Sequence, residues 1–196
     1  MTALLPATDA AISQAVQELR EGGLVVFPTD TVYGIACLED LPHAVDRLFT
    51  AKQRPPEKKV ARLVADLDQV IAHGALVDTR ARRLAEHFWP GPLTLVLPHA
   101  REGTVAYRVP DHPVALKLLR ALDCPLLVTS ANRSGEPDAL TAQDAEAVLP
   151  ATVSLILDGG PCPLKVASSI LQLSADSIEL LREGGLGLHE IEDALG

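Results

Sequence analysis

The sequence contains only three cysteines among 196 residues, and Cys37, Cys124 and Cys162 lie far apart. This odd and sparse set has no CxxC spacing, which argues against a disulfide framework or a zinc site and fits a reducing compartment. No apolar run approaches the ~20 residues that a membrane-spanning helix needs. The first residues, MTALLPATDA, lack a basic segment followed by an apolar stretch, so we expect a cytoplasmic protein without a secretory signal.

Positive charge is also scarce, since 17 Lys and Arg residues face 26 Asp and Glu residues and the net charge is -9. A long nucleic-acid groove needs a strong basic field, which the chain as a whole does not have. A small anion could still bind where cations gather locally. Aromatic residues make up only 3% of a chain that is 47% hydrophobic, so aliphatic side chains must fill the core. The length predicts a single domain over residues 1–196, with its core at about 10–186.

Several catalytic signatures are missing, among them GxSxG, HExxH and the Walker A spacing GxxxxGK[ST]. The histidines are scattered, so neither a catalytic triad nor a metal site is predicted. We expect these histidines on the surface: His43, His73, His87, His99 and His189.

Helical and extended patterns alternate along the chain, which predicts an α/β fold. Helices are expected at 11–20 and 78–88. Another should start at Asp40, with Pro42 in its first turn, and a last one at Leu188. Asp111 and Thr141 should each cap a further helix. Strands are expected at 24–27, 93–97, 105–109, 126–129, 153–157, 169–173 and 178–181. The last strands follow one another closely and should pair antiparallel, so the sheet is predicted to be mixed and twisted.

Two polar features follow or interrupt apolar strands. The segment 28–34 reads PTDTVYG, whose hydroxyls could bind a small polar ligand or could form an ST-turn beneath a tyrosine lid. Arg108 lies within an apolar strand and must find a partner, because a lone buried charge is costly. That partner could be a ligand carboxylate or phosphate, or an internal salt bridge.

Two further segments could bind an anion. The segment 52–59 reads KQRPPEKK and places four cations on a stretch stiffened by two prolines, which suits a polyphosphate or forms a solvated loop. The segment 129–135 reads TSANRSG and offers side chains and backbone amides for an anion, or forms a capped turn. By contrast, the FWPGP sequence at 88–92 is interpreted as structural.

Taken in order, these segments resemble the YrdC/Sua5/TsaC family of threonylcarbamoyl-AMP synthases, in the short TsaC-like form. The matching motifs are PTDTVYG at 28–34, KxR at 52–54, WPGPLT at 89–94, RVP at 108–110, SAN at 130–132 and the late Arg182. The resemblance implies a single YrdC-like domain with a twisted mixed parallel/antiparallel sheet, flanking helices and a concave substrate cleft. It also implies a nucleotidyltransferase that makes threonylcarbamoyl-AMP and pyrophosphate from L-threonine, bicarbonate or CO2 and ATP, with Mg2+, for the t6A37 modification of tRNA.

The resemblance assigns roles to matched positions. Lys52 and Arg54 are the implied catalytic cations. The implied threonine site consists of Thr31, Tyr33, Arg108 and Ser168. The implied nucleotide site consists of Arg54, Lys58, Thr104, Ser130, Asn132 and Arg182. The product would pass to a tRNA threonylcarbamoyl-transferase complex, whereas direct tRNA binding is expected to be weak.

Three positions depart from the family pattern. Lys59 and Val60 replace a proline-leucine pair, residues 165–169 read KVASS in place of GVEST, and Glu183 replaces a proline. These changes leave open a divergent paralogue that binds a nucleotide or RNA without this reaction.

Overall fold

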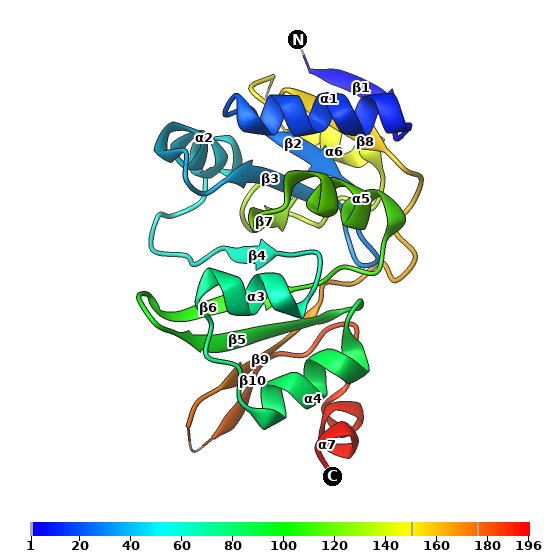
Figure 1. Ribbon diagram of the computed structural model, residues 1–196. Helices are drawn as coiled ribbons and strands as arrows, with labels where there is room; N and C mark the ends of the chain where they lie inside the picture. Colours follow the sequence, from blue (N-terminus) through cyan, green and yellow to red (C-terminus); the bar gives the residue numbers. More distant parts are fainter. Residues whose placement is uncertain (1, 150, 176) are drawn as a thin grey trace.

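A computed structural model describes residues 2–149, 151–175 and 177–196, and one mixed sheet runs through this part of the chain (Figure 1). Its ten strands lie in the order β1-β8-β2-β3-β7-β4-β6-β5-β9-β10. The strands are β1 (Ala3–Pro6), β2 (Val25–Phe27), β3 (Gly34–Leu38), β4 (Ala61–Leu63), β5 (Leu93–His99), β6 (Gly103–Arg108), β7 (Leu126–Ser130), β8 (Leu155–Asp158), β9 (Ser169–Leu173) and β10 (Ile178–Arg182). The helices are α1 (Asp9–Arg20), α2 (Pro42–Lys52), α3 (Leu67–His73), α4 (Thr79–Phe88), α5 (Pro113–Leu122), α6 (Ala142–Val148) and α7 (Leu188–Leu195).

The sheet has two halves that meet at the short strand β4. This strand pairs antiparallel with β7 on one side and parallel with β6 on the other. Figure 1 shows α1, α2, α5 and α6 beside the half that contains β1 to β3, and α3, α4 and α7 beside the half that ends at β10. The sheet contains both parallel and antiparallel pairs, so the predicted mixed sheet is confirmed.

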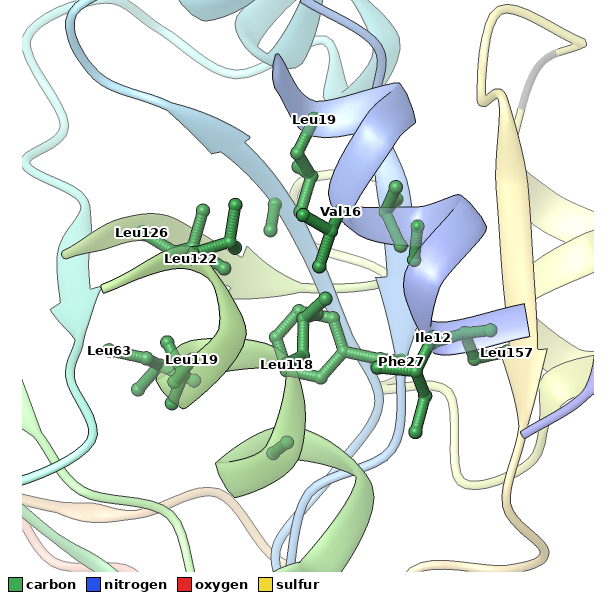
Figure 2. Packing of buried hydrophobic residues seen from close by; sticks show 14 of the residues in the cluster. Ile12, Val16, Leu19, Phe27, Leu63, Leu118, Leu119, Leu122, Leu126 and Leu157 are labelled. Atoms are coloured by element: carbon green, nitrogen blue, oxygen red, sulfur yellow. The ribbon is translucent and has the colours of Figure 1, made fainter. Parts of the chain in front are cut away.

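Aliphatic side chains fill the core, as the scarcity of aromatics requires. In one cluster, Leu19 of α1 and Leu118 and Leu119 of α5 are fully buried with Phe27 of β2 (Figure 2). The apolar residues of α1 recur at helical spacing, and Thr8 caps its first turn through a bond from the Ala11 amide. The predicted amphipathic helix at 11–20 is therefore confirmed, with a start two residues earlier.

Several expectations from the sequence need correction. Strands β1, β3 and β4 and helix α3 were not expected, because each is short and its register depends on partners that are distant in sequence. The side chain that caps α5 belongs to His112 instead of Asp111, through a bond from the Val114 amide. Helix α2 begins at Pro42 instead of Asp40.

Two of the histidines expected on the surface lie inside a polar network behind the sheet. His99 is 5% exposed, and its Nδ1 accepts hydrogen bonds from the amides of Arg101 and Glu102 at 3.2 Å. His73 bridges the Tyr107 hydroxyl at 2.6 Å and the Glu39 carboxylate at 2.7 Å. Both rings are enclosed because α3 packs over β5 and β6, which the sequence pattern did not indicate.

The buried cluster of Figure 2 generates a stability prediction. Leu118→Ala should lower the free energy of unfolding by about 2–5 kcal/mol, because truncation leaves a cavity among fully buried side chains. Leu76→Ala, at a position that is 59% exposed, should change it by less than about 0.5 kcal/mol. Urea denaturation followed by circular dichroism measures both. Equal effects of the two substitutions would contradict this account of the core.

Candidate functional site

A cavity of about 370 Å³ lies where the two halves of the sheet meet. Its walls come from the turn after β2, the segment that leads into β4, the inward faces of β5 and β6, the end of β7, and the loop and strand around Ser168 and Arg182. The predicted site residues that line it are Thr31, Tyr33, Arg54, Thr104, Arg108, Ser130, Ser168 and Arg182. Motifs spread over 150 residues of sequence are thus brought together, because strands from both halves meet at β4.

Arg108 is fixed at one end of the cavity by three partners. Its Nε donates to the Gly91 carbonyl at 2.9 Å, its Nη1 donates to the Thr31 hydroxyl at 2.7 Å, and its Nη2 pairs with the Asp30 carboxylate. Asp30 also accepts a bond from the Asp111 amide at 3.0 Å. Burial lowers the pKa of Arg108, and the neighbouring Asp30 opposes that shift, so the guanidinium stays charged. The internal salt bridge considered for Arg108 therefore exists, and the same side chain lines the cavity.

The turn after β2 is organised by the Thr29 hydroxyl, which is the ST-turn considered from the sequence. It accepts bonds from the Thr31 and Val32 amides at 3.1 and 3.2 Å and donates to the Val32 carbonyl at 2.7 Å. The Thr29 and Thr31 hydroxyls lie 2.9 Å apart. The turn thus holds the Thr31 oxygen where it accepts the hydrogen bond from Arg108.

Tyr33 follows this turn, but its hydroxyl does not act as a lid. The side chain is fully buried, donates to the Gly160 carbonyl at 2.8 Å and accepts a bond from the Gly159 amide at 3.3 Å. Burial raises the pKa of Tyr33 to about 12, so the phenol is neutral at physiological pH. It ties the loop after β8 to the turn after β2.

Lys52 lies behind the cavity wall and is 1% exposed. Its ammonium donates to the carbonyls of Ser130 and Asn132 and to Asn132 Oδ1, the last at 3.1 Å. The Ser130 hydroxyl donates to the same Oδ1 at 2.6 Å, and Ser130 faces the cavity. Burial lowers the pKa of Lys52 to about 8, which leaves the ammonium predominant at pH 7. In this arrangement Lys52 and Asn132 shape the loop after β7, and neither of these two predicted site residues lines the cavity.

Arg54 and Lys59 are the cavity-lining cations of the segment 52–59. Arg54 Nη2 donates to the Lys59 carbonyl at 2.7 Å, which closes this segment into a compact loop. Lys59 Nζ donates to the Thr104 hydroxyl at 2.9 Å across the cavity. Lys58, which the resemblance implied, is exposed and lies outside the lining. The motif match does not assign Lys59, and alternation along the chain does not single it out, because its neighbour Val60 lines the cavity as well.

Ser168 and Arg182 form the wall on the side of β9 and β10. The Ser168 hydroxyl contacts the Thr94 hydroxyl at 2.8 Å, and Arg182 donates to the Ser168 carbonyl at 2.8 and 3.0 Å. Ser169 is fully buried, donates to the Leu186 carbonyl at 2.6 Å and accepts bonds from the Gly184 and Leu186 amides. The altered 165–169 segment thus still supplies two serines that hold the cavity wall.

The cavity carries a positive field despite the acidic sequence. Arg54, Lys59 and Arg182 form no ion pair with any residue that the structure describes. Asp138 is the one acidic side chain among the described lining residues. Burial lowers the pKa of Arg54 and of Arg182, yet arginine remains charged at neutral pH. An elongated anion would therefore be attracted to this cavity.

Outside the cavity, His73, His99 and Glu102 bring potential metal ligands within 4.8 Å of one another. Both nitrogens of His99 are already hydrogen-bonded to the backbone, and those of His73 are bonded to Tyr107 and Glu39. Since neither histidine has a free ring nitrogen, these contacts hold α3 against the sheet. In the described part of the chain no helix is long and apolar enough to cross a membrane.

The position of Lys52 generates a second prediction. Lys52→Met should lower the free energy of unfolding by about 1–3 kcal/mol, because it leaves buried oxygens of Ser130 and Asn132 without a donor. Thermal denaturation measures the loss, with Lys117→Met on the surface of α5 as the control. Unchanged stability together with lost ligand binding would instead restore Lys52 as a direct ligand contact.

Comparison with known proteins reveals close relatives of similar sequence. The chain is 37% identical over 202 residues to a Bacillus subtilis protein named threonylcarbamoyl-AMP synthase, covering 98% of this chain and 58% of the relative. A Vibrio vulnificus protein with the same name is 36% identical over 159 residues, covering 76% of this chain and 86% of the relative. The chain thus spans less than two thirds of the length of the Bacillus relative.

Solved structures agree with the fold. Sua5 of Pyrococcus abyssi complexed with L-threonine superposes with a TM-score of 0.92 at 36% identity, covering 100% of this chain and 60% of that one. YciO of E. coli superposes with a TM-score of 0.85 at 28% identity, covering 94% of this chain and 96% of that one. A family model for Sua5, YciO and YrdC proteins, described as "Telomere recombination", matches residues 17–184. With the motifs gathered around one cavity, these matches show that the chain belongs to the Sua5/YciO/YrdC family.

Proposed function

We propose that this chain is a threonylcarbamoyl-AMP synthase that uses L-threonine, bicarbonate or CO2, and ATP. The observation that carries the proposal is the charge layout of the cavity. Arg108 stands beside the Thr31 hydroxyl at one end, and three cations without ion-pair partners line the remaining walls. Arg108 and Thr31 suit an amino-acid carboxylate, and the three cations suit a polyphosphate. The names of the relatives and the threonine bound to Pyrococcus Sua5 support the same assignment.

The reaction joins three substrates in two bond-forming steps. The threonine nitrogen first bonds to the carbon of CO2 or bicarbonate; with CO2 the amine proton passes to solvent, and with bicarbonate it leaves in the released water. A carbamate oxygen then attacks the α-phosphorus of ATP. The bond from that phosphorus to the β-bridging oxygen breaks, and pyrophosphate departs with the electron pair.

Two electrostatic tasks fall to the protein in this scheme. The attacking carbamate and the phosphate chain are both anionic, so they repel each other unless cations lie between and around them. Arg54, Lys59 and Arg182 would reduce that repulsion and stabilise charge on the leaving pyrophosphate. Arg108 and Thr31 would hold the amino acid so that its carbamate faces the phosphorus. No side chain is assigned as general base.

The donor set of the cavity also fits the magnesium ion that accompanies ATP. Magnesium in nucleotide sites is commonly held by one or two carboxylates together with phosphate oxygens and waters. Asp138 supplies a lining carboxylate, and the hydroxyls of Thr104 and Ser130 supply further oxygens. The bound ion would offset negative charge on the polyphosphate.

The product would pass to a tRNA threonylcarbamoyl-transferase complex. A divergent paralogue, which binds a nucleotide or RNA without this reaction, is the alternative. Its motivation was the altered segment 165–169, and the serines of that segment still hold the cavity wall. The network therefore favours the synthase over the paralogue.

Pyrophosphate release tests the proposal. Purified protein with ATP, Mg2+ and bicarbonate should release pyrophosphate only when L-threonine is present, and mass spectrometry should detect the adenylate. Arg54→Ala should lower kcat/KM by about 10²–10³-fold, because it removes a cation from the phosphate wall. Arg120→Ala, exposed on α5, is the control and should retain full activity. ATP binding without threonine-dependent release would instead establish the divergent paralogue.

A further inference from the structure

We propose that Lys59 binds the pyrophosphate portion of the nucleotide, and that its neighbour Lys58 does not. The inference deepens the proposed function, on which it rests for the identity of the nucleotide. It concerns a position where the family pattern described above has proline, so the motif match assigns no role to this lysine. Its basis is that, of two adjacent lysines, Lys59 lines the cavity and Lys58 does not.

The two lysines differ in what they face. Both side chains are exposed, but only Lys59 lines the cavity. The backbone between them is held by Arg54, whose Nη2 donates to the Lys59 carbonyl at 2.7 Å and whose Nε donates to the Lys58 carbonyl at 3.4 Å. Pro55 and Pro56 stiffen the same loop. This loop places Lys59 in the cavity lining and Lys58 outside it.

The Lys59 ammonium reaches across to β6. It donates to the Thr104 hydroxyl at 2.9 Å and to the Thr104 carbonyl at 3.4 Å. Among the residues that the structure describes, Lys59 has no carboxylate partner. A primary ammonium has three donors, so one remains for an additional acceptor such as a ligand oxygen.

Strand β6 gives the distance between the two ends of the cavity. Thr104, Ala106 and Arg108 alternate along this strand and all three line the cavity. Four residues at about 3.3 Å each place Thr104 about 13 Å from Arg108 along the strand. Arg108 suits the carboxylate of the amino acid. The other end of the cavity, where Lys59 lies, would therefore take the polyphosphate of ATP.

Arg54 and Lys59 would then contact the same group from one loop. Arginine offers a planar fork, and lysine adds a mobile point charge that can follow the oxygens of the departing pyrophosphate. Since negative charge on the leaving group increases in the transition state, this contact would contribute to the rate as well as to ATP affinity.

Isothermal titration calorimetry with inorganic pyrophosphate and Mg2+ tests the inference without requiring turnover. Lys59→Met should weaken pyrophosphate binding about tenfold, which corresponds to about 1.4 kcal/mol. Lys58→Met, the matched control one residue away, should bind within about twofold of the unsubstituted protein. Lys59→Arg should recover most of the affinity, and circular dichroism would confirm that all variants are folded.

The other possible results of this titration also test whether Lys59 contacts pyrophosphate. Equal weakening by both methionine variants would show a general field in place of a specific contact and would overturn the inference. Unchanged binding by Lys59→Met, or no pyrophosphate binding by the unsubstituted protein, would overturn it as well. If Lys59→Met alone loses pyrophosphate affinity but no threonine-dependent release is found, the proposed function fails and the Lys59 contact stands.

Discussion

The buried pair of Arg108 and Asp30 is the interaction on which the rest of the site depends. Arg108 ends β6 in one half of the sheet, and Asp30 belongs to the turn after β2 in the other. Both residues are more than nine-tenths buried, so neither charge could lie there without the other. Their pairing, with the bonds from Arg108 to Thr31 and Gly91, fixes how the two halves meet and therefore the shape of the cavity.

Other contacts across the seam between the halves work with this pair. Arg62 of β4 joins Glu39, after β3, to Glu102, in the turn between β5 and β6, at 2.6 and 2.8 Å. These bonds lie on the face of β4 opposite Ala61 and Leu63, which line the cavity. A strand of only three residues can thus connect the two halves, because polar groups on one face and the cavity wall on the other both position it.

The cavity also shows how an acidic chain can gather positive charge locally. The net charge of -9 describes the whole chain, while the field at the site depends on cations within a few ångströms. Arg54, Lys59 and Arg182 hydrogen-bond to backbone carbonyls or hydroxyls, which orient these cations without neutralising their charge. Lys52 belongs to the same cationic segment as Arg54 and Lys59, but its ammonium hydrogen-bonds to the loop after β7 instead. Cations that are close in sequence therefore have different roles, since Lys52 holds a loop while Arg54 and Lys59 line the cavity.

The sequence by itself determined the α/β class and the helices with clear apolar periodicity, such as α1 and α4. It also determined several polar residues of the cavity lining, namely Thr31, Arg54, Thr104, Arg108, Ser130, Ser168 and Arg182. Those predictions rest on local patterns and on motif order, which a linear chain carries. Tertiary structure alone decided that β3 and β4 are strands, that His99 is buried, and that Lys59 faces the cavity while Lys52, Lys58 and Asn132 do not. The reason is that a three-residue strand takes its register and facing from partners far away in sequence, and the facing of each side chain then follows from that register.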